Sequence, residues 1–178
     1  MIDTIHTPRM LLSRVAASDL DDYARFYADT RVTATLGGVR SREWVADYIE
    51  RAMAHWDQHR FGLWTARHRE TGAFVGRGGL RVADIDGKRE IEVAYGLMSE
   101  FWGQGFATEM AEASVDAAFT SLGLPDVVSF TLHTNLASRR VMEKVGFHYE
   151  RDIDYAELPH ALLRLTGEDW RSRKLSQR

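Results

Sequence analysis

The stretch of the sequence best suited to chemistry is Gly103-Gln104-Gly105. It separates an apolar run at 90–98, which has the pattern of a strand, from a helical pattern that begins at Phe106. Glycines at a strand-to-helix junction let the backbone approach a ligand and turn its N–H groups outward. The N–H groups of the first helical turn and the positive end of the helix dipole favour an anion. The stretch therefore predicts a phosphate or pyrophosphate site, with an ordinary glycine turn as the alternative.

Spacing distinguishes this loop from two common phosphate-binding loops. A P-loop has four residues between its glycines and a lysine after the second glycine, and this stretch has neither. A dinucleotide fingerprint needs glycine or alanine three positions after its second glycine, where this chain has Thr108. That fingerprint also needs an acidic residue at the end of the next strand, whereas Asp126 lies at its beginning. The loop alone thus leaves its ligand open.

A second group of residues follows the apolar run 127–133, which we expect to form a buried strand. Asn135 is a favourable helix N-cap, and Gly146 is a favourable left-handed residue at the end of the same helix. From Asn135 to Phe147 the segment has the pattern Asn-x-x-Ser-x-x-Val-Met-Glu-Lys-x-Gly-Phe. Asn135 is either a plain helix cap or a cap that also contacts a ligand.

Together, these two motifs resemble the GCN5-related N-acetyltransferase (GNAT) superfamily, and within it the branch that contains the ribosomal-protein N-terminal (alanine) acetyltransferases. The resemblance rests on Tyr95, on Trp102 to Glu109 (Trp-Gly-Gln-Gly-Phe-Ala-Thr-Glu) and on the segment that begins at Asn135. It covers residues 8–170, with its specific motifs between 92 and 147. Trp102 departs from the glutamine or arginine that is usual in the family, while Gly105 and Ala107 match.

The resemblance implies an α/β (α+β) fold in a single domain over 1–178. It implies a mixed, mostly antiparallel central sheet of about seven strands with helices on both faces. The strands at 92–98 and 127–133 are expected to splay apart, with the pantetheine arm of acetyl-CoA in the gap. No metal is expected. The residues implied for the cofactor are Leu97, Met98, Gly103, Gln104, Gly105, Phe106, Ala107, Thr108 and Asn135.

The implied reaction is acetyl transfer to a primary amine. The amine has a pKa of about 8 to about 10, so it must lose a proton before it can attack. Glu92, three residues before Tyr95, is the expected catalytic base, with a solvated strand residue as the alternative. Because the chain has no cysteine, the transfer is expected to be direct, without a cysteinyl intermediate.

The group that assists the leaving thiolate is less clear from the sequence. Many family members have a tyrosine where this chain has Met142, and methionine cannot donate a proton. Ser138 lies one helical turn earlier on the same face and is expected to hydrogen-bond the sulfur. The alternative for Ser138 is a small packing residue.

The expected acceptor is a protein or peptide N-terminal α-amino group or a small-molecule amine. An acyl-CoA-binding or sensing module with little catalysis is the alternative. Acidic residues at the start of the first helix and after Phe147 either attract a cationic amine or are simply solvated. His55 and His59 lie four apart but lack a third ligand, so we expect no metal there. His133 lies at the end of the strand beside the expected gap. The acidic residues are Asp19, Asp21, Asp22, Asp152, Asp154 and Glu157.

The expected elements alternate in a mixed pattern. A strand at 9–15 precedes helices that begin near Ser18 and at Ser41, the second of them extending to about residue 59. Strands at 61–67, 73–82 and 90–98 follow, joined by turns at 69–72 and at Asp86-Gly87. Helix, strand, helix and strand then alternate after residue 98.

Composition excludes several classes. The chain has 178 residues, 23 Lys+Arg against 26 Asp+Glu and no cysteine, so it contains no disulfide or thiolate metal site. Its net charge of −3 does not favour a nucleic-acid partner, and no apolar run is long enough to cross a membrane. We expect a cytoplasmic monomer or homodimer without a targeting signal. The basic tail at 171–178 is expected to be solvated and frayed, with an RNA-contacting tail as the alternative.

Overall fold

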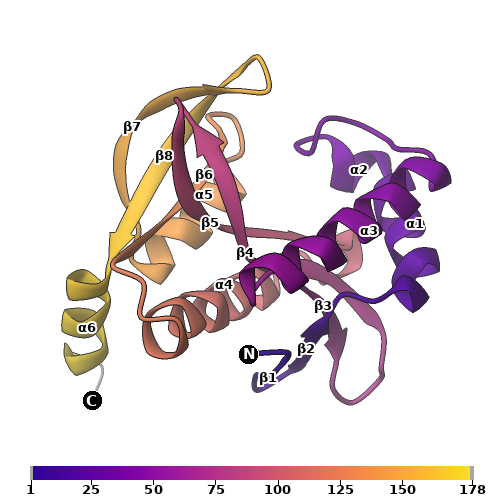
Figure 1. The fold of residues 1–178 in the computed structure, drawn as a ribbon, viewed down its shortest axis with the longest axis horizontal. Coiled ribbons are helices and arrows are strands. Elements are labelled where there is room, and N and C mark those ends of the chain that lie inside the picture. The colour runs from indigo at the N-terminus through magenta and orange to yellow at the C-terminus, as the bar shows by residue number, and fades with distance from the viewer. Residues whose placement is uncertain (1, 177–178) are drawn as a thin grey trace.

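The computed structural model describes residues 2–176, which form one sheet with helices on both sides (Figure 1). The sheet has eight strands in the order β1-β2-β3-β4-β5-β6-β8-β7, one more than about seven. All neighbouring strands are antiparallel except β5 and β6, which are parallel. The strands are β1 Thr4–His6, β2 Met10–Arg14, β3 Leu63–His68, β4 Phe74–Ile85, β5 Lys88–Leu97, β6 Asp126–Leu132, β7 His148–Tyr155 and β8 Leu158–Thr166.

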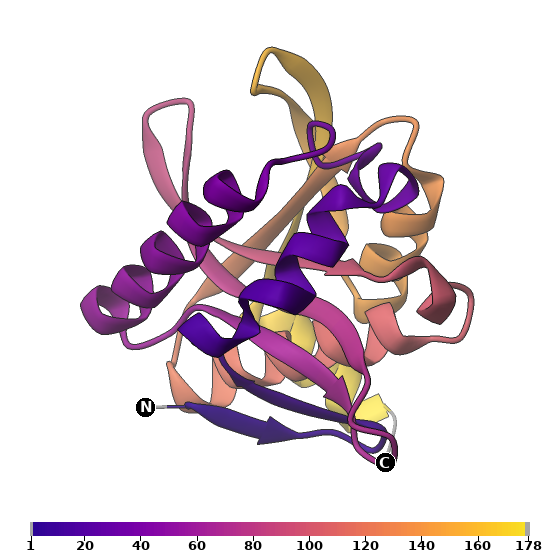
Figure 2. The ribbon, with the colours of Figure 1, turned by 90° about the vertical axis from the view of Figure 1, so that its right-hand side faces the viewer.

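The helices divide between the two faces of the sheet (Figure 2). A Cβ atom on Gly96 of β5 would lie 2.9 Å from the Phe26 ring, so that face is covered by α1. A Cβ atom on Gly78 of β4 would lie 2.2 Å from the sulfur of Met110, so the other face is covered by α4. The helices are α1 Leu20–Ala28, α2 Thr30–Thr33, α3 Arg42–His59, α4 Phe106–Asp116, α5 Leu136–Val145 and α6 Gly167–Ser176.

Helix α3 begins where its capping residue predicts. The Ser41 hydroxyl accepts a hydrogen bond from Trp44 N at 3.2 Å and caps α3. The first helix is present but begins at Leu20, two residues after Ser18, because a short 3₁₀ turn occupies Ala17–Asp19; Ser18 therefore does not cap it. The Asp19 carboxylate instead accepts from Ala16 N at 3.0 Å, which stabilises the turn.

The apolar core has two main clusters, one in each half of the sheet. The first surrounds the fully buried Trp56 and Trp64 and joins α1 and α3 to the N-terminal strands. The second packs α4 and α5 against the C-terminal strands around Leu80 and Leu163. Tyr95 touches both clusters, so it lies where the two halves of the molecule meet.

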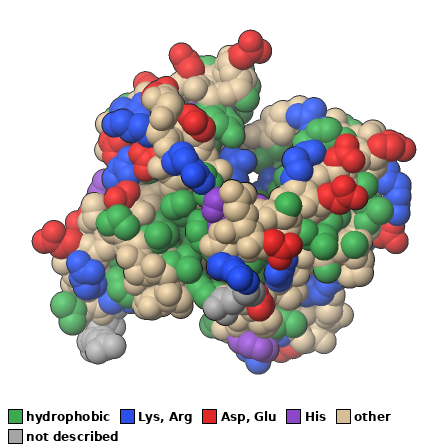
Figure 3. Space-filling model, viewed as in Figure 1, with side chains coloured by type: hydrophobic (Ala, Val, Ile, Leu, Met, Phe, Trp, Pro, Cys, Tyr) green, Lys and Arg blue, Asp and Glu red, His purple; other side chains and the backbone are tan. Residues whose placement is uncertain are grey.

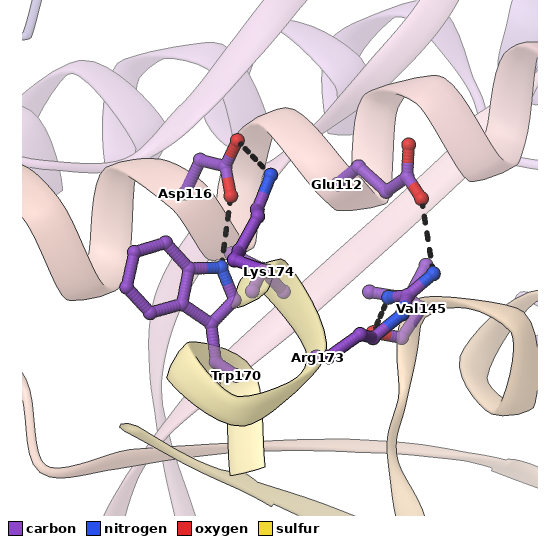
Figure 4. Close-up of a pocket in the computed structure, with 7 residues that line it drawn as sticks. Glu112, Asp116, Val145, Trp170, Arg173 and Lys174 are labelled. Carbon is purple, nitrogen blue, oxygen red and sulfur yellow. Dashed lines mark hydrogen bonds and ion pairs between the residues drawn. The ribbon is translucent and has the colours of Figure 1, made fainter. Parts of the chain in front are cut away.

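The C-terminal segment is helical and not frayed, although most of the side chains at 171–176 are solvent-exposed, as the sequence predicts. Residues 171–176 belong to α6, and residues 177–178 lie outside the described residues. Figure 4 shows α6 against α4, where Arg173 pairs with Glu112 at 3.3 Å and Lys174 with Asp116 at 2.9 Å. These ion pairs line the small pocket between the two helices, so α6 is docked on the domain. Within residues 2–176, no helix combines the length and the apolar character that a membrane span requires.

Candidate active site

The site begins at a gap between β5 and β6. These two strands pair at a single position, Glu92 with Val128, and the Ser129 hydroxyl donates to Val93 O at 2.8 Å. Beyond Val93, β5 stays paired with β4 as far as Leu97 but has no further pairing with β6, which is paired with β8 along its whole length. The predicted splayed pair is confirmed, and it leaves one edge of β5 without a strand partner.

Hydrogen-bond alternation decides which residues of β5 face the gap. Met98 N donates to Val75 O of β4 at 2.8 Å, and Met98 O accepts from Phe101 N at 3.0 Å. Because successive residues of a strand point their backbone groups to opposite edges, Leu97 and Tyr95 face the gap. The structure thus places Leu97 at the predicted edge but commits the Met98 N–H to β4. Tyr95, which the sequence did not single out for this role, takes the second position.

The glycine loop joins this edge to α4. Gly103 and Gly105 both have left-handed backbones, with φ of 72° and 83°. The first backbone bond within α4 is that of Glu109 N to Gly105 O, at 3.1 Å. The N–H groups of the first helical turn therefore point out of the helix end, as the anion-site prediction requires. The predicted stretch from Gly103 to Thr108 forms this one corner.

Arg9 of the N-terminal segment holds the loop from behind. Its Nη1 donates to Gln104 O at 2.8 Å, and its guanidinium carbon lies 4.0 Å from the centre of the Phe106 ring. Its Nε pairs with Glu109 Oε2 at 2.7 Å, and Thr7 donates to the other carboxylate oxygen at 2.6 Å. Burial raises the pKa of Glu109, but the hydrogen bonds from Thr7 and Arg9 outweigh it and lower that pKa. Sequence patterns did not reveal this long-range anchor.

The start of α5 borders the same gap. Asn135 Oδ1 accepts from Ser138 N at 3.2 Å, and its Nδ2 donates to Thr131 at 3.0 Å, so Asn135 is a helix cap. The Tyr95 hydroxyl lies 3.0 Å from Ser138 Oγ and donates to Ser138 O at 3.1 Å. Burial raises the pKa of Tyr95, so its phenol stays protonated. Met142 is buried at 2 % exposure and offers no donor.

Glu92 lies on the opposite face of the sheet, on the side of α1. It is 4 % exposed, so the alternative of a solvated strand residue is wrong. Arg81, its cross-strand partner in β4, donates from Nε to Glu92 Oε2 at 2.5 Å. Arg81 Nη2 reaches the hydroxyl of Tyr155 in β7 at 3.4 Å. A buried carboxylate therefore lies beside the gap, held by one arginine.

The acidic residues of the first helix do not form a cluster beside Glu92. Asp19 is buried and pairs with Arg67 at 3.0 Å, and Asp22 shares the same guanidinium at 2.7 Å. Asp21 pairs with Arg42 at 2.5 Å. Each of these carboxylates has an arginine partner, so they offer little net attraction for a cationic amine.

The histidines that the sequence singled out also have local partners. Both ring nitrogens of His55 are engaged, Nδ1 with Phe61 O at 3.0 Å and Nε2 with Val82 N at 3.1 Å. Burial lowers the pKa of His55, consistent with a neutral structural residue. His133 Nε2 lies 3.1 Å from Asp152 Oδ1. Residues 2–176 contain no group of three ligating side chains arranged for a metal ion.

The catalytic candidates therefore lie on both sides of one opening. Glu92 is on the side of α1 and α3, and the Tyr95–Ser138 pair is on the side of α4 and α5. In the space-filling view, the molecule is hollowed between the lobe of α1–α3 and the lobe of β6–β8 (Figure 3). The two groups of candidate residues thus lie on opposite faces of the sheet, beside the same gap between β5 and β6.

Comparison with known proteins agrees with this geometry. Residues 9–148 match the model of the acetyltransferase (GNAT) domain family. An uncharacterized protein, YkkB of Bacillus subtilis, is 31% identical over 119 residues, which span 64% of each chain. An uncharacterized N-acetyltransferase of the same organism, YoaA, is 27% identical over 152 residues, covering 84% of this chain and 85% of YoaA.

Solved structures share the whole fold. An acetyltransferase from Agrobacterium tumefaciens superposes with a TM-score of 0.80 at 27% identity, covering 93% of this chain and 95% of that one. A ribosomal-protein-S5-alanine acetyltransferase from Vibrio fischeri has a TM-score of 0.74 at 18% identity, covering 94% and 98%. Because only 18% of the residues are identical, the similarity to the Vibrio fischeri protein shows a shared fold and nothing more.

Proposed function

Because the chain belongs to the GNAT acetyltransferase family, we propose that it moves the acetyl group of acetyl-CoA directly to a primary amine at the gap between β5 and β6. The observation that carries the proposal is the single pairing between these strands, Glu92 with Val128. It frees a backbone edge directly beside a buried carboxylate. The acceptor is a protein or peptide α-amino group or a small-molecule amine.

The residues at the gap fit the two ends of the cofactor. The edge at Tyr95 and Leu97 offers backbone groups that suit the amides of pantetheine, much as a neighbouring strand would. The outward N–H groups at the start of α4 suit the pyrophosphate. Trp102 donates from its indole to Leu97 O at 3.0 Å, so it covers part of the same edge in place of the family's usual glutamine or arginine.

Glu92 is the proposed base. When bound, acetyl-CoA supplies an activated thioester carbon. On the α1 side, the Glu92 carboxylate accepts the proton of the approaching ammonium, directly or through one water. Arg81 orients that carboxylate through Oε2. A backbone N–H on the gap edge of β5 stabilises the negative charge that develops on the carbonyl oxygen.

The Tyr95–Ser138 pair is the proposed donor to the sulfur. Ser138 is too weak an acid to protonate a thiolate by itself, but a thiol with a pKa of about 8.5 is already a fair leaving group. A hydrogen bond from the hydroxyl pair suffices to stabilise the departing charge. The buried, protonated Tyr95 phenol donates to Ser138 O and lies 3.0 Å from Ser138 Oγ, so it positions the serine hydroxyl that we propose as the donor in the absence of an α5 tyrosine.

An acyl-CoA-binding or sensing module is the second candidate, and Met142 favours it because the usual proton donor is lacking. The test has two measurements on the intact protein: calorimetric binding of acetyl-CoA, and release of free CoA with a panel of primary amines. We expect both binding and amine-dependent release. Binding without release on any amine would favour the sensing module, and no binding would refute the gap as the acetyl-CoA site.

A further inference from the structure

Arg77 of β4 is a buried cation on the face of the sheet that carries Glu92. It lies opposite Gly96 of β5, and Arg81, the partner of Glu92, follows four residues later on the same face. Arg77 is 8 % exposed. Its Nε donates to the Tyr27 hydroxyl at 3.1 Å, and its guanidinium lies 5.8 Å from the Phe26 ring and 6.0 Å from the Tyr48 ring.

No carboxylate of residues 2–176 lies within ion-pair distance of Arg77, although sixteen such pairs occur elsewhere in that range. The nearest candidate on its face, Glu92, is engaged by Arg81. A buried cation without an anionic partner is costly, and the facing aromatic rings offset only part of that cost. The position therefore calls for a reason beyond packing.

The two terminal nitrogens of the Arg77 guanidinium, Nη1 and Nη2, are not fully enclosed, although the residue is buried. A guanidinium has five N–H donors, and Tyr27 accepts one of them. Nη1 and Nη2 of Arg77 make no hydrogen bond to the described residues. Among those residues, the fully buried side-chain nitrogens without a hydrogen-bond partner belong to Arg40, His68 and Arg139, so Nη1 and Nη2 are not fully buried. The exposed part of Arg77 thus includes the N–H groups of both Nη1 and Nη2. Two such groups side by side can bind a carboxylate through two parallel hydrogen bonds.

We propose that Arg77 binds a carboxylate of the acceptor, so that the preferred substrate is a primary amine that also carries an anionic group. This inference rests on the proposed acetyl transfer. Gly96 and Glu92 are four residues apart on β5, about 13 Å along the strand. An α-amino acid, whose amine and carboxylate share one carbon, fits this spacing of the two positions poorly. The geometry favours an amine and a carboxylate separated by several bonds, as in an ω-amino acid or a short peptide.

The test compares matched acceptors by initial rates of CoA release. One series consists of ω-amino acids of increasing chain length, a second of their carboxamides, and a third of short peptides with free or amidated carboxylates. We expect kcat/KM to favour the free carboxylate by about ten- to hundredfold at the best length. The small-molecule and peptide series separate the two sources of the carboxylate.

Variants then assign the preference to Arg77. Arg77→Met should abolish the carboxylate preference while the Kd for acetyl-CoA is unchanged, and Arg89→Met, an exposed arginine on β5, should leave both unchanged. Arg77→Lys keeps the charge but lacks the two-pronged donor, so it should lower the preference severalfold even where the methionine variant fails to fold. An equal loss for carboxylates and carboxamides in either variant would overturn the inference.

The outcomes separate the two proposals. If amines are acetylated without any advantage for a carboxylate, the role of Arg77 is refuted and the acetyltransferase function stands. If acetyl-CoA binds and no amine of any series is acetylated, the proposed function itself fails, and the acceptor role of Arg77 fails with it.

Discussion

At the scale of single residues, burial distinguishes Glu92 from the other acidic residues near it. Glu90 also lies on β5, but its carboxylate pairs with Arg164 at the far end of the strand. Glu92 is 4 % exposed and lies where β5 loses its second neighbour. It is therefore the buried carboxylate at the point where the gap begins, which is why we propose it as the base.

Glu92→Gln tests this residue as the base. The substitution keeps the shape of the side chain and removes its ability to accept a proton, so kcat/KM should fall by about 100-fold or more. The Kd for acetyl-CoA should stay the same, because the cofactor occupies the other side of the gap. Steady-state kinetics and calorimetry measure the two effects. Glu70→Gln, in the exposed turn before β4, is the control, and near-normal turnover of the Glu92 variant would exclude the role.

Ser138→Ala and Tyr95→Phe test the donor to the sulfur. Each removes one hydroxyl of a pair whose oxygens lie 3.0 Å apart, while the Tyr95 ring keeps its packing. Both should lower kcat, by about tenfold, more than they raise the KM for acetyl-CoA. The double variant should cost less than the product of the single effects, because the two groups act together. Wild-type turnover in both single variants would show that the sulfur leaves without their help.

At the scale of elements, the helix caps and the glycine loop could be predicted because their signals are local. The side chains of Ser41 and Asn135 each accept a hydrogen bond from the backbone N–H three residues later. The backbone N–H of Gly146 donates to carbonyl groups three and four residues earlier. The β7–β8 hairpin escaped prediction because its turn residues, Ala156 and Glu157, have positive φ without being glycine or asparagine. The orientation of the Met98 N–H toward β4, and of the Tyr95 backbone toward the gap, depends on the register with β4, which no local pattern fixes.

Gly105→Asp tests the loop as the pyrophosphate site. Aspartate introduces a negative charge beside the anion and a side chain at a left-handed position, so the Kd for acetyl-CoA should rise about 100-fold or more. Gly72→Asp, at a left-handed glycine with φ of 70° in a distant turn, controls for backbone strain. Calorimetry on folded protein gives both values. Equal affinity in the Gly105 variant and the control would place the pyrophosphate elsewhere.

At the scale of the whole molecule, the helices divide between the two faces of the sheet, with α1 and α3 on one face and α4 and α5 on the other (Figure 2). Under the proposed function, the first face meets the acceptor and the second meets the cofactor. The sequence predicted this division through its resemblance to a family. It did not predict how the N-terminal strands are tied to α4, because Arg9 and Glu109 are a hundred residues apart and no spacing rule joins them.

The Arg9–Glu109 tie makes stability depend on pH. The pKa of Glu109 is lower in the folded state, so its stabilising contribution is present above its unfolded value of about 4.3 and is lost as the pH falls through the folded value. Glu109→Gln should lower Tm clearly at pH 7, and the difference from the wild type should shrink as the pH falls below about 4. Thermal unfolding monitored by circular dichroism measures this.

Glu112→Gln is the matched control for that experiment. Glu112 lies on the same helix and pairs with Arg173, but its carboxylate is 47% exposed, so its removal should change Tm little at any pH. A difference in Tm between Glu109→Gln and the wild type that does not vary with pH would contradict the ionic role of Glu109.

The most direct test of the central claim is a crystal structure of the protein with CoA bound. The account predicts the pantetheine arm along the edge of β5 at Tyr95 and Leu97, with the sulfur near Ser138 and the pyrophosphate at the N–H groups that follow Gly105. A CoA molecule bound outside the gap between β5 and β6 would contradict it.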